Sequence, residues 1–118
     1  MRETIFCGKR CDNGEWVYGY VYKIWDSVYI LWGMTNGIPN MVKVIPETVG
    51  QYTGLTDKNG QKIFEWDIVK WFSKKYTVVY KEGRFIGEKE QFIGVDEYEF
   101  INLYGSLEVV GNVHGRVQ

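Results

Sequence analysis

The residues that could bind a metal ion or act as a nucleophile are few in this sequence. Cys7 and Cys11 are its two cysteines and His114 is its one histidine. Structural zinc usually takes two closely spaced ligand pairs. This chain offers one cysteine pair, a distant histidine and Asp12 as a conceivable fourth ligand. We expect two incidental thiols and no metal, cofactor or nucleophilic triad.

Carboxylates offer a second kind of chemistry. Glu65 and Asp67 are two residues apart, so on a strand they would share one face, and a further group follows at Asp96, Glu97 and Glu99. Such pairs can act as acid and base or hold a divalent ion. Any strand with one solvated face shows the same spacing, so we predict no catalytic residues and no enzyme.

A basic and aromatic segment over residues 69–86 is a candidate binding surface. Single-stranded nucleic-acid grooves combine cations that follow the backbone with rings that stack on bases. The predicted contact residues are Lys70, Trp71, Lys74, Lys75, Tyr76, Lys81 and Arg84. The alternative is that the rings face the core of a small barrel, while the lysines form the solvent-exposed face of a hairpin. Lysines there would also prevent an edge strand from pairing with another chain.

A second candidate surface lies in the segment 15–23. Trp16, Tyr18, Tyr20 and Tyr22 alternate with smaller residues, which is the period of a β-strand. The chain has five Trp and nine Tyr, more than a core of this size needs. Because Tyr and Trp are enriched at protein interfaces, we predict an interaction protein that binds itself as a homo-oligomer or binds another protein.

The elements that must position these residues are predicted to be short strands. No segment shows sustained helical periodicity, and turn signals such as Asn13-Gly14 and Asn59-Gly60 recur. Strands are expected over 15–23, 28–32, 41–45, 63–72, 76–80 and 109–113. Residues 33–40 are expected to be a loop, Pro46 to start at most one helical turn, and the last four residues to fray. Residues 92–105 fit two short strands or one strand and a helical turn. The predicted class is mainly β with small antiparallel sheets.

Length and composition limit the function classes. The chain has 118 residues, 45% of them hydrophobic, enough for one compact domain. Its net charge of −1 excludes a global attraction to nucleic acid or anionic membranes. The N-terminus lacks an apolar signal region, and no apolar run approaches the roughly 20 residues of a membrane span. We therefore expect a soluble intracellular protein with reduced thiols and no membrane partner.

The segment 44–70, VIPETVGQYTGLTDKNGQKIFEWDIVK, resembles the YopX family, small proteins carried by bacteriophages and prophages. The opening FCGKRCDNGEWVYGYV and the ending LEVVGNVHG resemble the ends of the same family. The resemblance implies a phage-derived, mostly β protein in the cytoplasm of the bacterial host, with a phage or host protein as partner. It also implies an SH3-like barrel over 46–118, packed on an N-terminal hairpin unit over 1–45. Family members usually carry Gly where this chain has Trp66, which puts a tight bend there in doubt.

Overall fold

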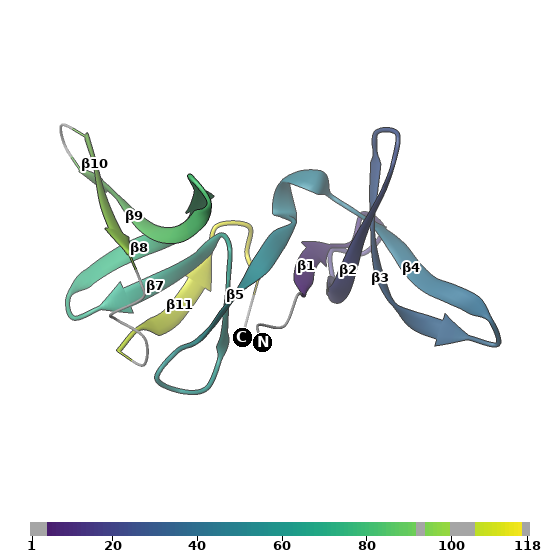
Figure 1. Ribbon diagram of the computed structural model, residues 1–118, viewed down its shortest axis with the longest axis horizontal. Coiled ribbons are helices and arrows are strands. Elements are labelled where there is room, and N and C mark those ends of the chain that lie inside the picture. The colour runs from purple at the N-terminus through teal and green to yellow at the C-terminus, as the bar shows by residue number, and fades with distance from the viewer. Residues whose placement is uncertain (1–4, 92–93, 100–105, 117–118) are drawn as a thin grey trace. The chain divides into compact units, whose positions relative to one another are not determined.

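The computed structural model describes residues 5–91, 94–99 and 106–116, and its fold is mainly β, as predicted (Figure 1). The chain divides into two units, Met1–Tyr52 (unit 1) and Thr53–Gln118 (unit 2). One 3₁₀ turn, η1 (Pro46–Thr48), confirms the helical turn expected at Pro46. Nothing helical in the described residues has the length and hydropathy of a transmembrane helix.

Unit 1 is built from antiparallel strands in the spatial order β4-β3-β2-β1, followed by the first residues of β5. Their bounds are β1 (Phe6–Lys9), β2 (Trp16–Ile24), β3 (Ser27–Thr35), β4 (Ile38–Val44) and β5 (Gly50–Thr56). The pairing of β2 changes partner along its length, from β1 up to Gly19 to β3 from Tyr20 onward. Ile30 and Val44 are fully buried and mark the inner face of this unit.

The expected loop over residues 33–40 was wrong. Here β3 and β4 continue on either side of a two-residue turn, Asn36-Gly37, with φ of 52° and 78° (Figure 1). Both angles are positive, as in the tight turns that suit the twist of a hairpin, and Asn-Gly adopts them readily. Pro39 is tolerated because β4 lies at the end of the strand order, where one side of the strand needs no ladder bonds.

Unit 2 contains a five-stranded antiparallel sheet in the order β10-β9-β8-β7-β11. The bounds are β6 (Lys62–Phe64), β7 (Asp67–Trp71), β8 (Lys74–Lys81), β9 (Arg84–Gln91), β10 (Gly94–Glu99) and β11 (Glu108–Asn112). Val69, Tyr76, Val78 and Val109 lie on one face of the sheet and form the core cluster together with Ile63 of β6 and Leu107, which precedes β11. In the described residues β10 and β11 end the sheet, so it is open and not the closed SH3-like barrel that the resemblance implies. Ile63 and Leu107 cover its core face instead. Of the ambiguous segment 92–105, residues 94–99 form a strand and the others lie outside the described residues.

The single strand expected over residues 63–72 is in fact two strands, β6 and β7, with a sharp bend at Glu65-Trp66. Trp66 has φ of 76°, in the left-handed region that favours glycine. Its backbone N–H donates to the carbonyl of Val78 at 2.8 Å, and its carbonyl accepts from the N–H of Val113 at 2.9 Å. These two bonds hold the bend, so the tight turn that Trp66 put in doubt is present.

Asp57 organises the turn between β5 and β6. Its side chain is buried, and Oδ1 accepts from the backbone N–H groups of Asn59 at 2.8 Å and Gln61 at 2.9 Å. Oδ2 accepts from the N–H of Val109 on β11 at 3.0 Å. One carboxylate thus shapes a turn and ties it to a distant strand.

Replacing Asp57 with alanine should lower the free energy of unfolding by about 2 kcal/mol, because the buried N–H of Val109 loses its acceptor. The N–H groups of Asn59 and Gln61 lie in the exposed loop and can bond to water instead, so their lost bonds contribute less to the destabilisation. Urea denaturation measures the change. Asn13→Ala is the matched control: Oδ1 of Asn13 accepts from the N–H of Glu15 in an exposed turn, and this variant should unfold near the wild-type midpoint. Equal effects of the two changes would contradict a structural role for Asp57.

Candidate interaction site

The predicted tyrosine strand is β2, and its aromatic side chains point to solvent. Tyr20 and Tyr22 are 60% and 52% exposed, and Tyr18 is also exposed, whereas Trp16 is half-buried. Val21 lies on the opposite face, opposite the fully buried Ile30 on β3. Strand alternation therefore places the tyrosine rings on one face of β2. Of the smaller residues between them, Gly19 is buried, whereas Val21 is itself 37% exposed.

Neighbouring strands extend this surface. The register places Tyr22 opposite Tyr29, and Tyr20 opposite Leu31, which in turn lies opposite Met41 on β4. Directly paired residues have their side chains on the same face of a sheet. We call the resulting three-strand surface the aromatic face; it consists of Tyr18, Tyr20, Tyr22, Tyr29, Leu31 and Met41.

The tip of the β2–β3 hairpin adds a further ring beyond the aromatic face. Trp25 is 90% exposed and has φ of 51°, a conformation in which a bulky residue is disfavoured. Most of the exposed large hydrophobic side chains in the described chain lie between Tyr18 and Ile38; the others are Phe72, Tyr80, Val110 and Val113. Such a concentration of exposed apolar groups is typical of an interaction surface.

The basic and aromatic segment 69–86 forms strands β7 and β8 and the start of β9, and alternation divides its residues between two faces. Lys70 pairs with Lys75 and Lys81 with Arg84, all on the face opposite the core. The core side carries Trp71, Lys74, Tyr76, Tyr80 and Phe85.

Tyr76 is only 2% exposed, and Lys81 lies 3.7 Å from a carboxylate oxygen of Glu88. Tyr76 is therefore a core residue and cannot stack on a base. Most of the predicted cations and rings lie on opposite faces of the strands, and Lys74 alone shares the face of the rings. Lys70 and Trp71 meet only at the end of β7, where both line a pocket. The division between two faces is the alternative arrangement considered for the segment, and nucleic-acid binding by its basic face stays a prediction.

The carboxylates Glu65 and Asp67 do not form a pair on one strand face. Glu65 lies in the bend, while Asp67 begins β7 and is completely buried. Oδ2 of Asp67 accepts from the N–H of Phe64 at 2.9 Å and Oδ1 from the amide of Asn112 at 2.8 Å, and Nη2 of Arg116 donates to both oxygens. Burial raises the pKa of Asp67, and these donors oppose that shift. Asp67 therefore stabilises the fold.

The structural role of Arg116 was not predicted from the sequence, because Arg116 lies in the tail that was expected to fray. Its side chain is 6% exposed, and its guanidinium carbon lies 4.8 Å from the centre of the Phe64 ring. A carboxylate just after a turn and an arginine near the C-terminus are common features, and their pairing across 49 positions leaves no local pattern.

The two cysteines differ in environment: Cys7 is buried and Cys11 is exposed. His114 packs edge-on against Trp66, with ring centroids 5.9 Å apart. Within the described residues no group of three or more His, Cys, Asp or Glu side chains has metal-binding geometry. Asp96, Glu97 and Glu99 belong to β10, but their side chains lie outside what is described. The absence of metal and cofactor stays a prediction.

These features define a small two-unit β protein whose candidate interaction site is an exposed aromatic sheet face. The YopX protein family model matches residues 6–116, so the chain belongs to the YopX family, as its motifs indicated. A search of curated proteins gave no match. A crystal structure of protein EF1440 from Enterococcus faecalis is similar with a TM-score of 0.55 and 22% identity, covering 97% of this chain and 95% of that chain. At this identity the similarity shows the fold alone.

Proposed function

We propose that this protein is a non-enzymatic interaction module of phage or prophage origin that acts in the host cytoplasm and binds protein through the aromatic face of unit 1. The observation that carries the proposal is the exposure of Tyr20 and Tyr22, 60% and 52%, on the same face of β2. These rings are not needed to fill a core.

The chemistry of the aromatic face suits protein contact. Tyrosine presents a large rigid ring with few rotatable bonds, and its hydroxyl can satisfy a polar group at an interface. Met41 adds an adaptable apolar side chain at the far strand. Burying these rings against a partner would gain hydrophobic free energy at a small entropic cost.

A partner is expected on the face of the sheet and not along its edge. The strand at the end of the order, β4, contains Pro39, which has no N–H to donate to an added strand. A second copy of the chain is the partner we propose first, because the same surface on two copies can form a two-fold interface. A phage or host protein is the alternative occupant.

Combining Tyr20→Ser with Tyr22→Ser should weaken self-association at least about tenfold, since a buried interface tyrosine contributes on the order of 1–2 kcal/mol. Sedimentation equilibrium measures the dissociation constant. The melting temperature should change little, because both rings are exposed in the single chain.

Tyr80→Ser is the matched control, because Tyr80 is 53% exposed but belongs to unit 2. It should leave association unchanged. Two results together would overturn the proposal. The wild-type chain would stay monomeric at high concentration, and no purified protein would bind it in a way that the double substitution abolishes.

A further inference from the structure

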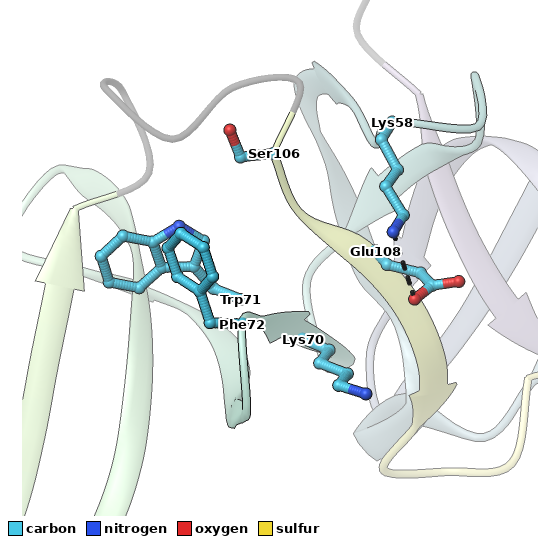
Figure 2. Close-up of a pocket in the computed structure, with 6 residues that line it drawn as sticks. All are labelled: Lys58, Lys70, Trp71, Phe72, Ser106 and Glu108. Carbon is cyan, nitrogen blue, oxygen red and sulfur yellow. Dashed lines mark ion pairs between the residues drawn. The ribbon is translucent and has the colours of Figure 1, made fainter.

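Unit 2 has a pocket of about 330 Å³ beside the end of β7. It is lined by Lys58, Lys70, Trp71, Phe72, Ser106 and Glu108. Figure 2 shows the Trp71 and Phe72 rings on one side of it and the Lys58–Glu108 pair on the other. The volume is at the lower end of the range for small-ligand pockets, which is suitable for a single nucleotide.

One of the two aromatic residues beside the pocket, Phe72, has an unfavourable backbone conformation. Phe72 is 80% exposed and has φ of 56°, at the first position of the two-residue turn between β7 and β8. Glycine or asparagine would adopt this angle with less strain than phenylalanine. Its ring lies 5.2 Å from that of Trp71, at an angle of 52°. A strained, exposed ring beside a pocket is expected where the ring has a contact to make.

The opposite side of the pocket is cationic overall. The register aligns Lys75, Lys70 and Glu108 across β8, β7 and β11 on the face opposite the core. Lys58 lies beside them, with Nζ 3.8 Å from Oε1 of Glu108, and the two side chains are 52% and 38% exposed. An ion pair this long and this exposed is weak, so Lys58 can turn to another anion.

We propose that this pocket binds a phosphorylated nucleoside, namely one unstacked base and its phosphate within a single-stranded nucleic acid. The exposed Phe72 ring stacks on the base, and the Trp71 ring, inclined to it by 52°, contacts the edge of the base. Lys58 and Lys70 bind the phosphate, and Lys75 extends the cationic track. A ligand with a ring but no anionic group would make no use of Lys58 and Lys70. A phosphate alone would leave the strained conformation of Phe72 unexplained. Stacking with nearby cations is the usual chemistry of single-strand recognition.

This site differs from the groove expected from the sequence. It keeps Lys70 and Trp71, adds Lys58 and Phe72, and makes no use of the buried Tyr76. It is also independent of the aromatic face, which belongs to unit 1. One activity can therefore fail without affecting the other.

The test is fluorescence anisotropy of the full chain with a labelled oligothymidine of about eight nucleotides, at low salt of about 50 mM. A duplex of the same length and thymidine monophosphate serve as competitors. We expect micromolar or weaker binding of the single strand, with both competitors at least about tenfold poorer. Lys70→Gln should reduce the slope of log affinity against log salt by about 0.7, the value for one phosphate contact on a single strand.

Phe72→Gly separates binding from folding. The substitution removes the ring and relieves the positive φ, so the unfolding midpoint should stay unchanged or rise while the dissociation constant rises at least about tenfold. Trp25→Gly is the matched control: Trp25 also has an exposed ring and a positive φ in a hairpin turn, and its loss should leave oligonucleotide binding unchanged.

Four results would overturn the proposal. The wild type could fail to bind the oligonucleotide at low salt, or Phe72→Gly could bind as the wild type does. Equal affinity for thymidine monophosphate and the strand would show that the pocket takes a free nucleotide, and preference for the duplex would exclude base stacking.

Discussion

Replacing Asp67 with asparagine should lower the free energy of unfolding by about 3–5 kcal/mol, the usual effect of breaking a buried ion pair from one side. The carboxylate is completely buried and accepts bonds from the Phe64 N–H, the Asn112 amide and the Arg116 guanidinium. Asparagine places an N–H₂ group among these donors and leaves the charge of Arg116 buried without a counterion. The β6–β7 bend, β11 and the C-terminal segment then lose their common attachment.

A surface pair of the same chemistry provides the control. Nε and Nη2 of Arg10 donate to the two oxygens of Asp12 at 2.9 and 2.7 Å, but this pair is exposed. Water replaces a lost partner there, so Asp12→Asn should unfold close to the wild-type midpoint. Urea denaturation of both variants tests the contrast. Similar midpoints for Asp67→Asn and Asp12→Asn would show that burial does not determine the strength of the Asp67–Arg116 pair.

Much of the fold could be predicted because its signals are local. Asn59-Gly60 lies in the turn between β5 and β6, as expected, with φ of 81° at Gly60. Alternation of large and small residues located β2, and the final strand, expected over 109–113, is β11 (Glu108–Asn112). Each signal involves neighbouring residues whose backbone angles or side-chain directions are set by the residues themselves.

The remaining features depend on contacts between distant residues. The loop expected over 33–40 was wrong because Pro39 suggests a break, whereas a strand at the end of a sheet tolerates it. The strand expected over 63–72 was wrong because Trp66 conceals a bend that backbone bonds to Val78 and Val113 impose. Neither partner lies within ten positions of Trp66, so no local pattern could reveal the bend.

The candidate sites divide in the same way. The tyrosines that β2 contributes to the aromatic face were predictable, because they alternate along one strand. Tyr29, Leu31 and Met41 were not, because they join this face through the register of β2, β3 and β4. The pocket was not predictable, because it joins the β7–β8 turn to Lys58 and Glu108 through the pairing of β11 with β7. Basic and aromatic residues were visible in the sequence, but the strand register decides which of them meet.

Replacing Gly19 with alanine should cost unit 1 at least about 3 kcal/mol, at the upper end of the usual effect of overpacking. A Cβ at this position would lie 2.2 Å from the carbonyl oxygen of Leu31, 2.9 Å from its carbon and 3.2 Å from Cα of Trp32. All three are backbone atoms, which cannot move aside by changing a rotamer. The two strands must separate where β2 passes from β1 to β3.

Gly111→Ala controls for the general effect of adding a methyl group to a glycine in a strand. Its Cβ would meet only the side-chain carbon Cδ1 of Ile68 at 3.8 Å, an ordinary contact, so its stability should be unchanged or higher by about 0.5 kcal/mol. Hydrogen exchange distinguishes the variants: Gly19→Ala should expose the amides of β2 and β3. Since Tyr18 and Tyr20 flank Gly19, self-association should also weaken. A Gly19→Ala chain with wild-type exchange in β2 would show that the backbones of β2 and β3 do not approach so closely, and the aromatic face would then lack the support assigned to it.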